Sequence, residues 1–202
     1  MNKYTLVTAL FVLLLNSCTS LEESDEIIKK DIVVQVDENK KFIKYLESDW
    51  EETLINNPLF ASYTGDKRFN DKLNPITIDQ FNKDRNLDLE SLIKLNDINP
   101  DKLSEDNKLN YNLKKFDIES DLNLSQFPIY YLRLNQRGGI QSFYETGNRL
   151  VYQSKKDYYD WLSRLEQFSE NILTFLDINK QGLKNGYTQP KLVTRGVVAQ
   201  ID

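Results

Sequence analysis

The sequence has no histidine, one cysteine and one methionine, and only 7 glycines and 5 prolines among its 202 residues. Without an imidazole group the chain cannot form a Ser-His-Asp or Cys-His catalytic unit, a histidine base that titrates near neutral pH, or a histidine-ligated zinc site. A single cysteine also excludes a disulfide within the chain, so the hydrophobic core has to provide the stability. Any chemistry carried by these residues would rest on carboxylates, lysine or tyrosine.

The charge balance argues against nucleic acid as a partner. The chain has 26 Lys and Arg against 31 Asp and Glu, a formal net charge of −5 at pH 7. Binding to phosphates, whether of nucleic acid or of an anionic bilayer, needs a basic surface. The 40% of hydrophobic and 28% of charged residues are typical of a globular protein. Composition alone does not indicate what the protein does.

The N-terminus has the pattern of an export signal. Lys3 precedes an apolar run from Tyr4 to Leu15, which is too short to cross a membrane because a spanning helix needs roughly 20 apolar residues. The run leads into Leu15-Asn16-Ser17-Cys18, which resembles the bacterial lipobox, a motif that is cleaved before a cysteine whose amine and thiol are then acylated. We therefore predict a lipoprotein signal peptide over residues 1–17 and lipid attachment at Cys18, with several acyl chains holding the protein on the membrane.

Residues 18–39 are polar and acidic and predict a tether between the lipid anchor and the folded part. Its early acidic cluster also resembles the surface-export signal of some lipoproteins, but a solvated tether is the favoured interpretation. Thr19 follows the cysteine, where many lipoproteins retained in the inner membrane of Gram-negative bacteria have aspartate. The expected location is the bacterial cell envelope, and the outer membrane if the source is Gram-negative.

From residue 40 onward the periodicity is helical and predicts an all-α domain over residues 40–202. Apolar residues recur every four positions from Phe42 to Leu54, which predicts a helix that ends near Asn56. Pro58 then fits the first position of a short helix capped by Asn57 and stopped by Gly65.

Four further helices follow. Thr77 and Gln80 form the pattern of a capping box at the start of one helix, and Ser104 begins another with Leu109, Leu113 and Phe116 on one side. The longest helix is expected from Ser154 to near Gly186, and a last one after Gln189 and Pro190. Because this last pattern stops at Asp202 while still apolar, the domain is expected to be truncated at its C-terminal end.

Residues 125–153 form the one long stretch without a clear helical pattern, and predict an irregular crossover. It contains aromatic residues and the Gly138-Gly139 pair, and glycine permits turns that other residues disfavour. The crossover is a candidate ligand surface, but packing of its aromatic side chains between helices is the favoured role.

Several groups of residues are candidates for chemistry, and each has a structural alternative. Paired carboxylates occur at Glu22-Glu23, at Glu51-Glu52 and at Asp84 with Asp88; they can act as acid and base or hold a cation, but exposed helical carboxylates are the favoured reading. Tyr158, Tyr159 and Trp161 are candidates for stacking on sugars or peptides, yet their helical spacing favours the core. Arg137-Gly138-Gly139 is too short for an RNA-binding repeat or a phosphate loop.

One segment resembles a known family. Residues 57–71 (NPLFASYTGDKRFND) are similar to the opening motif of the domain of unknown function (DUF) 885 family. Later segments agree with that family in order: residues 103–106 before 109–111, Leu134-Asn135-Gln136 with its glycine pair, the helix over 159–165, and Gly182, Gly186 and Pro190 before 193–202.

The resemblance implies the N-terminal portion of a larger, largely helical, metallopeptidase-like fold. Full members are similar to gluzincin-type zinc peptidases, whose His-Glu-x-x-His helix supplies two zinc ligands and a water-activating glutamate. This chain has no histidine, so no catalytic or metal-binding residue transfers to it, and zinc is implied for full-length members only. What transfers is a role as one wall of a substrate cleft, with Asn135 and Gln136 as residues that face the cleft.

Three functions remain as hypotheses. The preferred one is an exported lipoprotein that is the N-terminal fragment of a zinc-peptidase-like protein, inactive alone, with a peptide substrate in the full-length protein. The second is a complete helical envelope lipoprotein that binds peptides or glycans. The third is a structural spacer of the cell envelope, which would have no ligand.

Overall fold

The computed structural model describes residues 29–30, 32 and 37–201 of the chain. Helices make up most of this part, and it contains no β-strand, only an isolated antiparallel bridge between Asn135 and Gly138. The predicted all-α fold is therefore confirmed. The predicted signal peptide, the predicted lipid attachment at Cys18 and most of the predicted tether lie outside the described residues.

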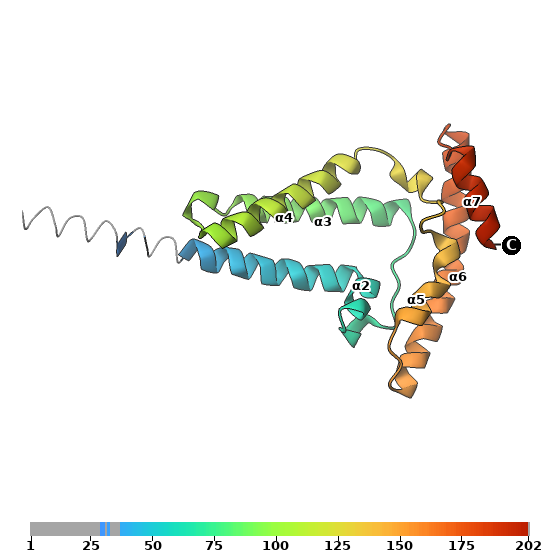
Figure 1. The fold of residues 1–202 in the computed structure, drawn as a ribbon, viewed down its shortest axis with the longest axis horizontal. Helices are drawn as coiled ribbons and strands as arrows, with labels where there is room; N and C mark the ends of the chain where they lie inside the picture. Colours follow the sequence, from blue (N-terminus) through green and yellow to red (C-terminus); the bar gives the residue numbers. More distant parts are fainter. Residues whose placement is uncertain (1–28, 31, 33–36, 202) are drawn as a thin grey trace, which may run out of the picture.

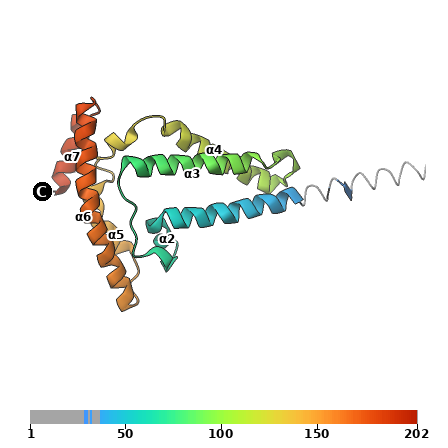
Figure 2. The same cartoon turned by 180° about the vertical axis from the view of Figure 1, so that it is seen from behind.

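Three helices lie side by side and a fourth, longer helix crosses one end of them (Figures 1 and 2). The three are the helix over residues 37–56, α3 (Ile78–Asn96) and α4 (Glu105–Leu124). The crossing helix is α6 (Lys155–Lys184), the longest in the described part of the chain. No helix in the described part is long and apolar enough to cross a membrane.

The main hydrophobic core lies between helix 37–56, α3 and α4. Of the apolar stripe predicted for helix 37–56, Phe42 is fully buried in this core and Leu46 packs against it, whereas Trp50 is exposed. The rings of Phe42 and Tyr111 lie 6.1 Å apart between centroids, so the first helix packs directly on α4. The buried residues of this cluster are Phe42, Tyr45, Leu95, Ile98, Leu103, Tyr111 and Ile118.

The short helix α2 (Pro58–Tyr63) begins where the sequence predicts it, with proline at its first position and Gly65 after it at φ 93°. Glycine suits that turn because positive φ is strained for other residues. The predicted cap by Asn57 is wrong. Its side chain makes no capping bond and instead donates to the Thr53 carbonyl, 3.0 Å away on the preceding helix. A 3-10 turn, η1 (Lys67–Phe69), follows.

The capping box predicted for α3 is half formed. The Thr77 hydroxyl accepts a bond from the Gln80 backbone amide at 3.1 Å, but the Gln80 side chain donates to Asp84 instead of accepting from the Thr77 amide. After the 3-10 turn η2 (Pro100–Lys102), α4 starts as expected after Ser104. The Ser104 hydroxyl donates to Asn39 at 3.2 Å instead of capping α4, and so joins α4 to the first helix.

The apolar stripe predicted for α4 lies on its exposed side. Leu109, Leu113 and Phe116 are all exposed, whereas Tyr111 and Ile118 provide the buried face. The side of α4 that packs in the core is therefore not the side that has Leu109, Leu113 and Phe116.

The crossover between α4 and α6 has more local structure than an irregular loop. It contains the 3-10 turns η3 (Ile129–Leu132) and η4 (Ile140–Ser142) and the short helix α5 (Tyr144–Arg149). Some of its aromatic residues pack on helices, as the favoured role predicts: the Phe143 ring stacks on Phe168 of α6 with centroids 3.8 Å apart, and Tyr130 stacks on Phe81 of α3. Phe127 and Tyr144 are exposed.

Helix α6 starts with a complete capping box. Ser154 Oγ accepts from the Asp157 amide, and the Asp157 carboxylate accepts from the Ser154 amide at 2.8 Å. The face of α6 that packs on the rest of the protein is largely polar, while many of its leucines are exposed. The buried residues of this helix are Asp157, Asp160, Arg164, Asn171, Phe175, Ile178 and Gly182.

The last helix, α7 (Lys191–Ile201), begins after Gln189 and Pro190 as predicted. The Gln189 amide donates to the carbonyl of Leu132, and Gln200 donates to the carbonyl of Gln136 at 2.9 Å. These bonds join α7 to the crossover.

Candidate binding cavity

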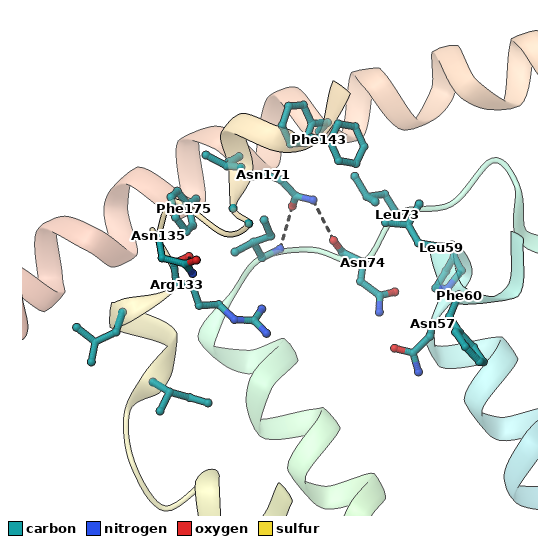
Figure 3. Close-up of a pocket in the computed structure, with 18 residues that line it drawn as sticks. Asn57, Leu59, Phe60, Leu73, Asn74, Arg133, Asn135, Phe143, Asn171 and Phe175 are labelled. Atoms are coloured by element: carbon teal, nitrogen blue, oxygen red, sulfur yellow. Dashed lines mark hydrogen bonds between the residues drawn. The ribbon is translucent and has the colours of Figure 1, made fainter. Parts of the chain in front are cut away.

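A cavity of about 830 Å³ opens where α2, the segment before α3, the crossover and α6 meet (Figure 3). Its volume lies within the range of roughly 300–1,000 Å³ that is usual for ligand sites. Among the 18 residues that line it, most are apolar or aromatic, four are asparagines and one, Arg133, is charged.

The first wall is the start of α2. Pro58, Leu59 and Phe60 line the cavity there, and their position depends on a buried arginine of α6. Arg164 is fully buried, and its Nη2 donates to the Pro58 carbonyl at 3.0 Å and to Ser62 Oγ at 2.8 Å. A charged donor strengthens such bonds, so Arg164 fixes α2 against α6.

The second wall is the extended segment over residues 73–76. Asn171 on α6 accepts from the Ile76 amide and donates to the Asn74 carbonyl, both at 2.9 Å (Figure 3). Gln167, one turn earlier, accepts from the Leu73 amide at 2.9 Å. The backbone of this segment has no helix or sheet partner, so these side chains form its hydrogen bonds. Polar groups away from water need such partners.

An aromatic surface lies at the α6 side. Phe143 stacks on Phe168, and on its other side the ring of Trp161 lies 5.5 Å from it at 21°. Phe175, which is buried, extends the surface along α6. Stacked rings of this kind form a rigid apolar wall that suits aliphatic or aromatic ligand groups.

The turn at residues 135–139 closes the cavity opposite α2. The Asn135 side chain accepts from the Arg137 amide at 3.0 Å and donates to the Arg133 carbonyl at 3.2 Å. Asn135 lines the cavity, and much of its side-chain hydrogen bonding is used to hold the turn. Gly138 lines the cavity with no atom within 4 Å of the position where a Cβ would lie.

Gln136 lies beside α7 rather than among the residues that line the cavity. Its carbonyl accepts from Gln200, and its side chain would be 3.0 Å from a Cβ at Gly196. The structure thus separates the two residues predicted to face a cleft, with Asn135 at the cavity and Gln136 against the last helix.

Arg133 follows η3 and extends into the cavity (Figure 3). Its guanidinium lies over the ring of Phe81, 4.6 Å from the centroid, a favourable cation–π arrangement. Burial by surrounding atoms lowers its pKa from the usual value, and only Asp84 acts in the opposite direction.

The tyrosines predicted to join the core do not. Tyr158 and Tyr159 are exposed, although Tyr158 stacks on Tyr152 with centroids 4.8 Å apart. Trp161 alone of the three packs inward, against Phe143. The prediction is wrong because the buried face of α6 is the polar one.

The carboxylate pairs do not converge on the cavity. Glu51 pairs with Arg68 at 2.6 Å, and Glu52 pairs with Lys94 at 2.7 Å, so these two neighbours serve separate ion pairs.

Asp84 and Asp88 lie on the same side of α3, and this side faces Asp121 of α4. Burial raises the pKa of Asp88, and the nearby carboxylates of Asp121 and Asp84 add to the increase. Glu22 and Glu23 lie outside the described residues.

Sequence reasoning did not single out Arg133, Asn171, Phe143 or Phe168. A signal for part of the site is present in α6, where Arg164, Gln167 and Asn171 recur at three- and four-residue spacing and so share one face. A buried polar face of this kind, on a helix whose leucines lie on other sides, indicates contact with irregular backbone.

All but one of the lining residues fall within a segment that matches a known family. The model of the family described as "Bacterial protein of unknown function (DUF885)" matches residues 58–202, well over half of the chain. The chain belongs to the DUF885 family. Comparison with curated proteins and with solved structures gave no match.

The family resemblance implies a zinc ion for full-length members, which would need histidine, cysteine or carboxylate ligands. The chain contains no histidine, and its described residues bring no three histidine, cysteine, aspartate or glutamate side chains together in a geometry for a metal. These residues do not fit a zinc site, and no catalytic step through zinc is derived for them.

Proposed function

We propose that this DUF885-family chain is a lipid-anchored protein of the bacterial cell envelope whose helical part binds peptides without hydrolysing them. The observation that carries the proposal is the cavity, with its volume of about 830 Å³ and its largely apolar lining. Ligand sites typically combine such a lining with a few polar groups that fix orientation.

The lining favours peptides over glycans. Aliphatic side chains such as Leu59, Ile129 and Ile140 dominate with the phenylalanines, which suits apolar peptide side chains. The side-chain nitrogens of Asn57 and Asn74 donate to the carbonyls of Thr53 and Asn56, and their side-chain oxygens can accept from a peptide N–H. A sugar, in contrast, needs many more polar partners for its hydroxyl groups.

Composition supports the non-catalytic part of the proposal. The 202 residues have no histidine to bind zinc or to act as a base, and none of the described carboxylates lines the cavity. The zinc peptidase activity implied by the resemblance would therefore need residues other than these.

The sequence Leu15-Asn16-Ser17-Cys18 supports the lipid anchor. Acylation of Cys18 would hold the protein on a membrane, and Thr19 after it favours the outer membrane in a Gram-negative source. In a Cys18→Ala variant expressed in bacteria, we expect the protein to move from the membrane fraction to the soluble fraction. Unchanged partitioning would contradict the anchor.

Peptide binding is tested with the full chain in detergent and N-acetyl-Leu-Phe-amide as the probe, followed by calorimetric titration. Gly138→Trp should fill the cavity and abolish binding, because its Cβ meets no atom. Asn112→Trp, at an exposed position of α4, is the matched control and should bind as the unmodified chain does.

The same titration distinguishes the rival functions. A structural spacer predicts no heat of binding and no rise in melting temperature with any probe. Binding of oligosaccharides but not of peptides would favour the glycan alternative. Release of Phe-amide from the probe, dependent on added zinc, would contradict the non-catalytic part.

A further inference from the structure

The single charge in the cavity forms no ion pair with the described residues, although the Asp84 carboxylate lies near enough to act on its pKa. Arg133 is the only charged residue among those that line it. Within the described part of the chain its guanidinium forms no ion pair and donates no hydrogen bond, and its contact is with the Phe81 ring. The side chain nevertheless keeps substantial exposure, so a ligand in the cavity can reach it.

This arrangement favours an anion. Surrounding atoms displace water from the guanidinium and lower its pKa, although it stays charged at any physiological pH. A partly desolvated cation that faces an apolar space gains more from an anionic partner than an exposed one does, because the local dielectric is lower. The planar guanidinium also matches a carboxylate with two parallel hydrogen bonds.

The surroundings fix which anion fits best. Among the described residues that line the cavity Arg133 is the one cation, without a lysine or a second arginine, so the cavity balances one negative charge rather than the two of a phosphate. On the far side from Arg133 lie Asn57 and Asn74, beyond an apolar space (Figure 3). A ligand that spans this distance has one carboxylate end, an apolar body and backbone amides.

We propose that the cavity binds the C-terminal end of a short apolar peptide, with Arg133 pairing with the terminal carboxylate. This inference rests on the proposed peptide-binding function and names the part of the peptide that is recognised. Arg133 is then the residue that distinguishes a free C-terminus from an internal segment of a longer chain.

The test compares N-acetyl-Leu-Phe with its C-terminal amide by calorimetric titration of the full chain in detergent. We expect the acid to bind about tenfold more tightly than the amide, a difference in the range of a charged hydrogen-bonded pair. Arg133→Gln should lower the affinity for the acid about tenfold and leave that for the amide within about twofold. Arg133→Lys should retain part of the preference because it keeps the charge without the planar geometry.

Arg137→Gln is the matched control, since Arg137 is exposed in the adjacent turn and does not line the cavity. It should keep the full preference for the acid. Melting temperatures of all variants, measured without ligand, show whether loss of the contact with Phe81 has unfolded the protein. Loss of the preference in Arg137→Gln but not in Arg133→Gln would overturn the assignment.

The remaining outcomes separate this inference from the function on which it rests. Equal affinity for the acid and the amide would overturn carboxylate recognition and leave peptide binding standing. No binding of either peptide would overturn both. A second comparison, of decanoate with decanamide, tests whether the ligand is a fatty acid. Tight binding of decanoate without binding of the peptide acid would overturn the proposal that the carboxylate belongs to a peptide.

Discussion

Arg164 and Pro58 are 106 positions apart in the chain, and the Arg164 Nη2 atom donates to the Pro58 carbonyl at 3.0 Å. The same guanidinium group donates to the carbonyls of Phe69 and Lys72, at 3.1 and 2.8 Å. One fully buried arginine of α6 therefore satisfies three carbonyls of the segment that forms the α2 wall of the cavity.

Arg164→Met should lower the free energy of unfolding by about 3 kcal/mol, because it leaves several buried carbonyls unpaired. Urea unfolding of the full chain measures this. Arg149→Met is the control: Arg149 forms an exposed pair with Glu145, so its loss should cost less than about 1 kcal/mol. Equal losses in the two variants would show that Arg164 does not fix the wall.

The stability of the folded state should decrease at acid pH because of Asp157 in the cap of α6. The backbone amides of Gln153 and Ser154, together with Lys67, lower the pKa of Asp157 below its usual value of 3.8. A carboxylate with a lowered pKa stabilises the folded state above the pKa of the unfolded chain, and this stabilisation decreases as the pH falls through the pKa of the folded state.

Asp157→Asn should therefore lower the stability by the same amount at pH 7 and pH 5, and by a progressively smaller amount below about pH 4. Unfolding by urea at pH 7, 5, 4 and 3 measures the difference between the variant and the unmodified chain. A difference that stays constant down to pH 3 would contradict the role of the ionised carboxylate.

The ends of the helices could be predicted from the sequence because their signals are local. Ser154 and Asp157 form the complete capping box at α6, and Pro58 and Gly65 mark the start and end of α2 as expected. These residues act within a few positions of one another, so a single sequence contains the necessary information.

The buried faces could not be predicted in the same way. Leu162 and Leu176 of α6 are exposed, whereas Arg164 and Asn171 are buried. Apolar periodicity assumes that a helix packs on apolar neighbours, but α6 packs on irregular backbone, whose amides and carbonyls need polar partners. The cavity is equally non-local, because residues as distant as Leu59 and Phe175 meet there.

Ionisation of Asp88 should lower the stability of the folded state, whereas ionisation of Asp157 raises it. Burial first, and then the carboxylates of Asp121 and Asp84, raise its pKa. An acid whose pKa is raised on folding destabilises the folded state when it ionises, so stability decreases as the pH rises from its usual pKa toward the raised value.

Asp88→Asn should raise the free energy of unfolding at pH 7 by roughly 0.5 kcal/mol, the size of a typical surface effect. The gain should disappear below about pH 4, where the aspartate is protonated in both states. Thermal unfolding at pH 7 and pH 3.5 tests this, and destabilisation at pH 7 would contradict the expected repulsion.

A chain of hydrogen bonds joins the three helices around the main core. Ser91 Oγ donates to Asp49 at 2.7 Å, and the Tyr45 hydroxyl lies 2.8 Å from the same Ser91 oxygen. Serine has one hydroxyl proton, so Tyr45 is the donor to Ser91. Lys114 of α4 pairs with the other oxygen of Asp49 at 2.6 Å. The contacts thus run from helix 37–56 to both α3 and α4.

Tyr45→Phe should lower the free energy of unfolding by about 1 kcal/mol, because it removes one buried hydrogen bond. Ser91→Ala should lower it by about 2 kcal/mol, because it removes the bonds to both Tyr45 and Asp49. The double variant should lose less than the sum by about 0.5–1 kcal/mol, since the two groups bond to one another. Urea unfolding of the four proteins completes the cycle. Burial raises the pKa of Tyr45 to about 12, so its hydroxyl keeps its proton and remains a donor at neutral pH. Strictly additive losses would show that the two hydroxyl groups act independently.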